Sequence, residues 1–225
     1  SIFKPLFGVE LTGSAEELAR LIRERNSVGI QQLLEAGLSP DSIDSGNPAI
    51  RLAAELGFNE GVSLLLARGA KVDARGADGS TALLTAIRRN NTALARVLLE
   101  KGAKVTLSAD DATTPLMAAA QKGNLTLSEL LIKGGSDLSA KNSSGFRALD
   151  YAVQSESLAV VELLIKNGAS PLEPDGAGET PLYKAINLKN QPLTKALMSR
   201  GANFDTPTSS GRTVREQVFE KGMNI

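Results

Sequence analysis

The chain has 225 residues, and its 25 Lys and Arg balance its 25 Asp and Glu, which argues against a general binder of nucleic acid or anionic membranes. It contains no Cys and no His, which excludes disulfides, a thiolate nucleophile, an imidazole base and zinc held by those side chains. No apolar run approaches the length of about 18 residues that a membrane-spanning helix needs.

The first predicted element is a helix over residues 14–25, which follows an N-terminal tail of residues 1–12. Ser14 and Glu17 have the spacing of a capping box, and the charged residues around them indicate a helix that shields the start of the fold from water. The apolar residues of the tail either fold back on this helix or belong to a segment behind a signal or lipid anchor. The start at Ser1 fits either a trimmed fragment or a mature exported protein.

Glycine then recurs at a fixed step of 33 residues along most of the chain. The first series consists of Gly69, Gly102, Gly135, Gly168 and Gly201. A second series, 23 residues ahead of the first, consists of Gly46, Gly79, Gly145, Gly178 and Gly211, with Ala112 in the slot between Gly79 and Gly145. Two glycine series in fixed phase predict a single array of about six similar repeats over residues 13–225, in which each repeat contacts only its neighbours.

The repeat that begins at Gly79 shows what one repeat contains. Thr81 is placed to cap a helix whose apolar residues have helical spacing, and Asn90-Asn91 interrupts that pattern. A second helical pattern ends before Gly102, where a left-handed helix cap favours glycine. An exposed loop follows, so one repeat is predicted to be helix, turn, helix and loop.

Two motifs carry a resemblance to a known family. They are Gly178-Glu179-Thr180-Pro181-Leu182-Tyr183-Lys184-Ala185 and Leu164-Ile165-Lys166-Asn167-Gly168-Ala169. These motifs and the 33-residue step resemble the ankyrin repeat over about residues 13–221. The resemblance implies an all-α solenoid (α-solenoid) of stacked helix-turn-helix repeats with protruding β-hairpin loops, closed here by a terminal helix at 213–221.

The chain departs from the ankyrin pattern where the family usually has a His after Thr-Pro-Leu, a residue that ties the start of the helix to the neighbouring repeat. The corresponding residues here are Leu84, Met117, Asp150, Tyr183 and Glu216, so we expect some loss of stability. The repeat at Gly145 is the most divergent, because Phe146-Arg147 stands where the pattern has any residue followed by Thr.

Acidic residues gather in two predicted loops, at Asp110-Asp111 and at Glu173 with Asp175. Neither group has a metal-ligand pattern, so we expect solvated turn residues and predict no metal and no cofactor. A Ser-His-Asp triad is impossible without His, and an open stack lacks a closed pocket. An enzyme would need a buried ionisable pair with shifted pKa values, which the sequence does not indicate. The chain is therefore predicted not to be an enzyme.

In ankyrin repeats, the ends of the first helices and the loop tips line the concave face that binds a partner. The resemblance gives these candidate partner-binding residues: Arg75, Arg88, Arg89, Asp110, Asp111, Gln121, Lys122, Phe146, Tyr183 and Leu188. Arg88-Arg89 and Gln121-Lys122 occupy the same position in adjacent repeats. A basic centre flanked by aromatic residues is typical of binding hot spots and suits a partner protein with an acidic patch. For any one residue, a solvated helix surface is the alternative.

The sequence thus predicts a protein-binding module that is a monomer when free, with no nucleic-acid partner and no membrane span. A narrower hypothesis is an exported or periplasmic bacterial protein that acts as an inhibitor, an immunity protein or a chaperone for its partner, with a cytoplasmic location as the alternative. The second functional hypothesis is a scaffold segment of a larger protein, with no activity of its own.

Overall fold

The computed structural model describes residues 13–208 and 210–220, so the predicted tail at 1–12 and the predicted helix end at Lys221 lie outside the described residues. The described residues form two compact units that divide between Asp110 and Asp111. The N-terminal unit contains α1 (Ala15–Arg23), α2 (Ser27–Glu35), β1 (Ile43–Asp44), β2 (Asn47–Pro48), α3 (Ala49–Glu55), α4 (Asn59–Ala67), α5 (Ala82–Arg88) and α6 (Thr92–Glu100). The C-terminal unit contains α7 (Pro115–Gln121), α8 (Leu125–Lys133), α9 (Ala148–Gln154), α10 (Leu158–Lys166), α11 (Pro181–Asn187), α12 (Gln191–Met198) and α13 (Val214–Glu220). The single array predicted over 13–225 spans both units and stays a prediction.

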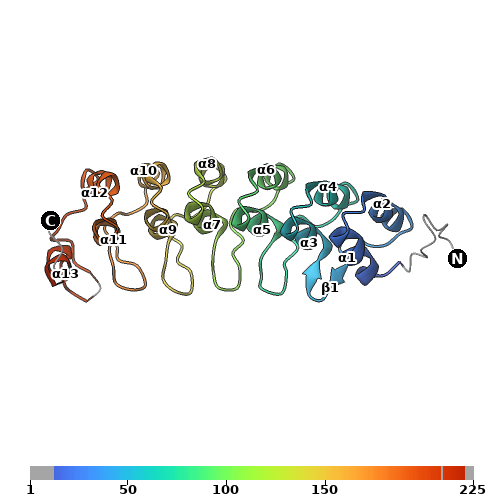
Figure 1. The fold of residues 1–225 in the computed structure, drawn as a ribbon, viewed down its shortest axis with the longest axis horizontal. Coiled ribbons are helices and arrows are strands. Elements are labelled where there is room, and N and C mark those ends of the chain that lie inside the picture. Colours follow the sequence, from blue (N-terminus) through green and yellow to red (C-terminus); the bar gives the residue numbers. More distant parts are fainter. Residues whose placement is uncertain (1–12, 209, 221–225) are drawn as a thin grey trace. The chain divides into compact units, whose positions relative to one another are not determined.

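Each unit is a stack of helix pairs, with its helices in two rows (Figure 1). In the N-terminal unit the inner row is α1, α3 and α5, and each of these helices packs against the outer helix that follows it in the chain. In the C-terminal unit the inner row is α7, α9, α11 and α13, and the outer row is α8, α10 and α12. The predicted helix-turn-helix repeats are therefore confirmed.

The core of each unit is made of small residues on the inner helices and leucines on the outer helices. The alanines that recur every 33 residues are fully buried: Ala53, Ala86, Ala119, Ala152 and Ala185. Five outer-helix leucines are fully buried as well: Leu65, Leu98, Leu131, Leu164 and Leu197. Because alanine adds little bulk, inner helices can pack closely, and the leucines fill the space between the two rows.

Threonine caps begin several inner helices, as the sequence predicts. The Oγ1 of Thr81 accepts a hydrogen bond from the backbone N–H of Leu84 at 3.3 Å. Thr114 and Thr180 cap α7 and α11 in the same way, and each is followed by a proline at the first helical position. After the outer helix α6, Gly102 has the left-handed backbone that the sequence predicts, with a φ of +87°.

The loops project from the inner rows, and the first of them contains a short β-hairpin (Figure 1). β1 and β2 pair in antiparallel fashion, with Ile43 opposite Pro48. Other loops are closed by turns: the N–H of Gly76 donates to the carbonyl of Ser80, and the N–H of Asp175 donates to that of Glu179, both at 2.9 Å. None of the described helices is both long and apolar enough to cross a membrane.

Candidate functional site

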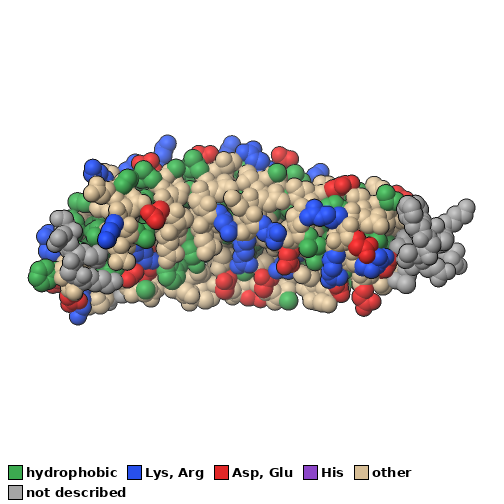
Figure 2. Space-filling model, viewed as in Figure 1, with side chains coloured by type: hydrophobic (Ala, Val, Ile, Leu, Met, Phe, Trp, Pro, Cys, Tyr) green, Lys and Arg blue, Asp and Glu red, His purple; other side chains and the backbone are tan. Residues whose placement is uncertain are grey.

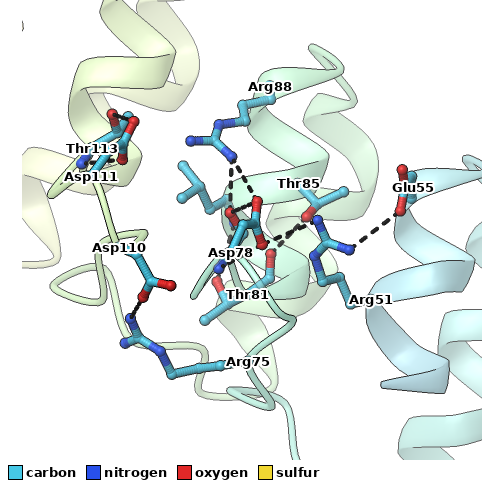
Figure 3. A network of polar contacts seen from close by, with 12 residues as sticks. Arg51, Glu55, Arg75, Asp78, Thr81, Thr85, Arg88, Asp110, Asp111 and Thr113 are labelled. Carbon is cyan, nitrogen blue, oxygen red and sulfur yellow. Dashed lines mark hydrogen bonds and ion pairs between the residues drawn. The ribbon is translucent and has the colours of Figure 1, made fainter. Parts of the chain in front are cut away.

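A loop-tip carboxylate, Asp78, joins two inner helices of the N-terminal unit (Figure 3). Its Oδ1 lies 3.2 Å from a guanidinium nitrogen of Arg51 on α3, and its Oδ2 lies 3.5 Å from one of Arg88 at the end of α5. Ser80 donates its hydroxyl to the same carboxylate at 2.8 Å and accepts a hydrogen bond from Arg88, also at 2.8 Å. One acidic side chain thereby fixes two arginines.

The surroundings of Asp78 keep its carboxyl group in the charged form. Burial acts to raise the pKa of the Asp78 carboxyl, but the hydrogen bonds from Ser80 and the charge of Arg51 outweigh burial and hold the pKa below its ordinary value. The carboxylate therefore stays ionised at neutral pH, and Arg51 and Arg88 keep their partner.

A second arginine contact connects neighbouring loop tips in the same unit. Arg75 donates to the carbonyl of Ser108 at 2.8 Å, and its guanidinium lies 3.7 Å from the carboxylate of Asp110. The backbone N–H of Asp110 donates to the carbonyl of Asp78 at 3.0 Å. We call the surface formed by Arg51, Arg75, Asp78, Arg88, Arg89 and Asp110 the Asp78 surface.

Two arginines of the predicted basic centre are already paired with acidic residues of this unit. Arg88 is paired with Asp78 and Arg75 with Asp110, so their charges are partly neutralised within the unit. Arg89, which caps the end of α5, is exposed and has no ion-pair partner among the described residues. Figure 2 accordingly shows acidic and basic side chains intermixed over the N-terminal unit.

In the C-terminal unit, Gln121 and Lys122 are exposed at the end of α7, and Leu188 is exposed after α11. Asp111 is also exposed, although its carboxylate accepts hydrogen bonds from the backbone and the hydroxyl of Thr113, both at 2.9 Å. These four residues are therefore accessible, as a partner-binding role requires.

Two aromatic residues of the predicted set, Phe146 and Tyr183, contact other residues of the same unit or are buried in it. The ring of Phe146 is half-buried, with its centroid 5.8 Å from that of Tyr151 and 4.5 Å from the ammonium nitrogen of Lys184. Tyr183 is only 2% exposed, because its position on α11 faces the interior. A partner therefore has no access to the Tyr183 ring, and we leave this residue out of the proposed surface.

The most unusual feature of the C-terminal unit is a cluster of buried charges at the start of α9. Arg147 donates its backbone N–H and its Nε to Asp150 Oδ2, at 2.8 and 3.2 Å. The same guanidinium donates to the carbonyls of Glu173 and Pro174 at 2.6 and 3.1 Å, and also to the carboxylate of Glu173. A loop of the following repeat is thereby held over the start of α9.

Asp175 in that loop is buried, which corrects the expectation of a solvated turn residue. Its Oδ1 accepts hydrogen bonds from the backbone N–H groups of Ala177 and Glu179, at 2.8 and 3.0 Å. Its Oδ2 forms an ion pair with Lys184 of α11, which is also buried. We call Arg147, Asp150, Asp175 and Lys184 the buried charge cluster.

The cluster also contains a buried carboxyl with a shifted pKa, Asp150, which the sequence does not indicate. Burial raises the pKa of the Asp150 carboxyl, and this effect exceeds the opposing influence of the Arg147 N–H, the Arg147 charge and the Lys184 charge. Among the described residues, no group of three or more acidic side chains is arranged to hold a metal ion.

Comparison with known proteins identifies the family of these repeats. A family model described as ankyrin repeats (3 copies) matches residues 18–109 and 106–175. The chain belongs to the ankyrin repeat family. Ankyrin repeats are generally protein–protein interaction modules and are typically not enzymes. No curated protein matches the chain.

The sequence contains one signal that could have pointed to the buried charge cluster. In the ankyrin repeat at Gly145, Arg147 stands in place of the capping Thr and Asp150 in place of the His, so two departures of opposite charge lie three residues apart. Lys184 carries no such signal, because the position before the buried alanine of an inner helix is variable among these repeats.

Proposed function

We propose that this ankyrin protein binds a partner protein through the Asp78 surface. The observation that carries the proposal is that three arginines of this surface, Arg51, Arg75 and Arg88, are held by hydrogen bonds and ion pairs to neighbouring residues in the free chain. Ordering long side chains opposes association, so arginines that are already ordered lose less entropy on binding. Arginine is also among the residues that contribute most to binding hot spots.

The charges of the surface define the partner that suits it. Arg89 is exposed without an internal counterion, and the side chains of Arg75 and Arg88 are 43% and 36% exposed. Asp110 is 67% exposed and adds one negative charge at the loop tips. A partner with an acidic patch opposite Arg89 and a hydrogen-bond donor opposite Asp110 matches this pattern.

In the C-terminal unit, the proposal includes the exposed residues Asp111, Gln121, Lys122 and Leu188, together with the half-buried ring of Phe146. Leu188 supports it, because 39% of its surface is exposed in a row of otherwise polar helix ends.

The test compares two substitutions in the N-terminal unit, each of which replaces an exposed arginine by glutamate. Arg89→Glu reverses the charge at the proposed surface, and Arg96→Glu does so on the exposed side of the outer helix α6. Each variant and the unmodified chain would be used to capture proteins from an extract of the source organism, and captured proteins would be titrated with each variant by calorimetry. We expect a protein that binds the unmodified chain and Arg96→Glu but at least tenfold more weakly to Arg89→Glu. Equal affinities for both variants would contradict the proposed surface.

The narrower proposal is that binding blocks the partner, as in an exported bacterial inhibitor or an immunity protein. It predicts a one-to-one complex in which the partner loses its activity, measured with the purified partner. A partner that binds with its activity unchanged would favour the scaffold alternative.

A further inference from the structure

A lysine and an aspartate of the buried charge cluster meet in a site that excludes water. The side chains of Lys184 and Asp175 are 8% and 0% exposed. The Phe146 ring covers the lysine nitrogen at 4.5 Å from its centroid. Lys184 Nζ and Asp175 Oδ2 form an ion pair, yet neither atom has a hydrogen-bond partner among the described residues. The amine and the carboxylate are therefore in direct contact inside the protein.

The other oxygen of Asp175 is held by two donors. The backbone N–H groups of Ala177 and Glu179 lie 2.8 and 3.0 Å from Asp175 Oδ1. When a nucleophile attacks a carboxyl carbon, negative charge develops on the oxygen that remains, and a fixed pair of N–H donors stabilises that charge. The loop thus supplies an oxyanion hole for attack at Asp175 Cγ.

A third group, Asp150, is placed to move protons. Arg147 holds its Oδ2, whereas its Oδ1 is buried and has no hydrogen-bond partner among the described residues. The Asp150 carboxyl is close enough to Lys184 for the ammonium charge to act on its pKa, which burial raises. A carboxyl whose pKa is raised toward neutrality gains and loses a proton more readily near neutral pH.

We propose that Lys184 and Asp175 form an intramolecular amide bond, an isopeptide, with Asp150 as the proton carrier. Asp150 takes a proton from the Lys184 ammonium, and the free amine attacks Asp175 Cγ, so that an N–C bond forms. The carbon–oxygen bond to Oδ2 then breaks, and Oδ2 leaves as water with two protons that came from the lysine nitrogen. Asp150 ends as it began, and no oxidant or cofactor is consumed.

The loop around Asp175 is held in place by contacts on both sides of that residue. The Arg147 guanidinium binds the backbone carbonyls of the two residues that precede Asp175. Gly176, the residue that follows, lies so close to the preceding loop that a Cβ on it would stand 1.7 Å from the carbonyl oxygen of Ser144. Two groups that are held together in this way react far more readily than the same groups free in solution. The inference does not depend on the proposed function.

Intact-mass spectrometry of the purified full chain tests the proposal. We expect a mass lower than that of the sequence by one water molecule, together with a peptide in which Lys184 and Asp175 are joined and trypsin does not cleave after Lys184. Lys184→Arg keeps the positive charge but removes the nucleophile, and we expect it to have the full mass of its sequence. Asp175→Asn is expected to lose ammonia in place of water, because the side-chain amide nitrogen is then the leaving group.

Asp150→Asn tests the proton carrier, with circular dichroism to establish that the variant is folded. A folded Asp150→Asn chain of full mass would support the role of Asp150, whereas complete bond formation in it would overturn that role. An unmodified chain of full mass that trypsin cleaves at Lys184 would overturn the isopeptide. A loss of water that persists in Lys184→Arg would overturn it too, because it would show a succinimide at Asp175-Gly176.

Discussion

Arg147 and Asp150 show how two substitutions can compensate for each other within one ankyrin repeat. The carboxylate of Asp150 accepts the backbone N–H and the Nε of Arg147 at the start of α9. Arg147 is held in turn by the loop of the next repeat. The repeat that the sequence marks as most divergent is therefore tied to its neighbour by charged hydrogen bonds, which are stronger than neutral ones.

The sequence could not predict this cluster, because its burial depends on how closely two loops approach. Glycine at position 176 permits that approach, since any side chain there would collide with the backbone at Ser144. Once the loops are in contact, Asp175 is covered. Read from the sequence alone, Asp175 has the composition of an ordinary solvated turn.

At the residue scale, we predict a pH dependence from Asp150. Burial raises its pKa in the folded chain above the ordinary value of 3.8, so between these two values the folded state binds more protons than the unfolded state. The free energy of unfolding should therefore fall as the pH rises through this window. The groups that face Asp150 are Arg147 and Lys184, and both limit the size of the effect.

The measurement compares Lys184→Arg with Lys184→Arg/Asp150→Asn, because both chains lack the amine that could form an isopeptide. Urea unfolding would be followed at intervals of pH from the ordinary pKa of 3.8 upward. The chain with Asp150 should lose stability relative to the Asn variant as the pH rises. Parallel curves for the two variants would show that Asp150 does not titrate with a raised pKa.

At the scale of the element, the helix starts were the most predictable feature. Thr81, Thr114 and Thr180 cap their helices as the sequence predicts, because the capping hydrogen bond is local and needs only a hydroxyl at the right position. The turns between inner and outer helices were less predictable. Glu156 and Lys189 adopt left-handed backbones there, with φ of +54° and +55°, where glycine would be expected.

Replacing the cap of α5 tests the contribution of one helix start. Thr81→Ala removes the acceptor of the Leu84 N–H, so we expect a loss of about 1 kcal/mol in the free energy of unfolding. Thr106→Ala is a matched control in the same unit, because Thr106 is exposed in a loop. Urea unfolding of both variants measures the difference. Equal midpoints would mean that the hydrogen bond to Thr81 adds nothing to stability.

At the scale of the whole molecule, the 33-residue glycine period predicted the stacked helix pairs, because a stack of similar repeats needs only contacts between neighbours. The division between Asp110 and Asp111 was not predicted, because the first glycine series continues across it from Gly102 to Gly135, although the second series has Ala112 in place of glycine there. The candidate binding surface was predicted in part: its exposed helix ends follow from the repeat pattern, whereas the ion pairs to Asp78 depend on loop geometry.

Overpacking one inner helix should show how stability is distributed. Ala119 is fully buried in α7, so Ala119→Leu should destabilise the chain by about 1–3 kcal/mol. Because contacts in a stack are between neighbours, the increase in hydrogen exchange over the unmodified chain should be larger in α7–α10 than in α1–α4. Mass spectrometry under native conditions measures this exchange. Ala159→Leu, at an exposed position of α10, is the control. Exchange that increases equally in all helices would mean that the stack opens only as a whole.

The buried charge cluster also limits how this array can be lengthened. Stacked repeats with similar interfaces allow an extra repeat to be inserted between neighbours, which is one way such proteins gain length by duplication or design. Arg147 and Asp150 lie in one repeat, whereas Asp175 and Lys184 lie in the next. Each of these ion pairs stays within its own repeat, but an insertion would take the carbonyls of Glu173 and Pro174 away from the buried guanidinium of Arg147. A buried donor left without its acceptor costs about 1–3 kcal/mol, and more when it is charged. We therefore expect these two repeats to keep their stability better when they are copied or moved together than when they are separated.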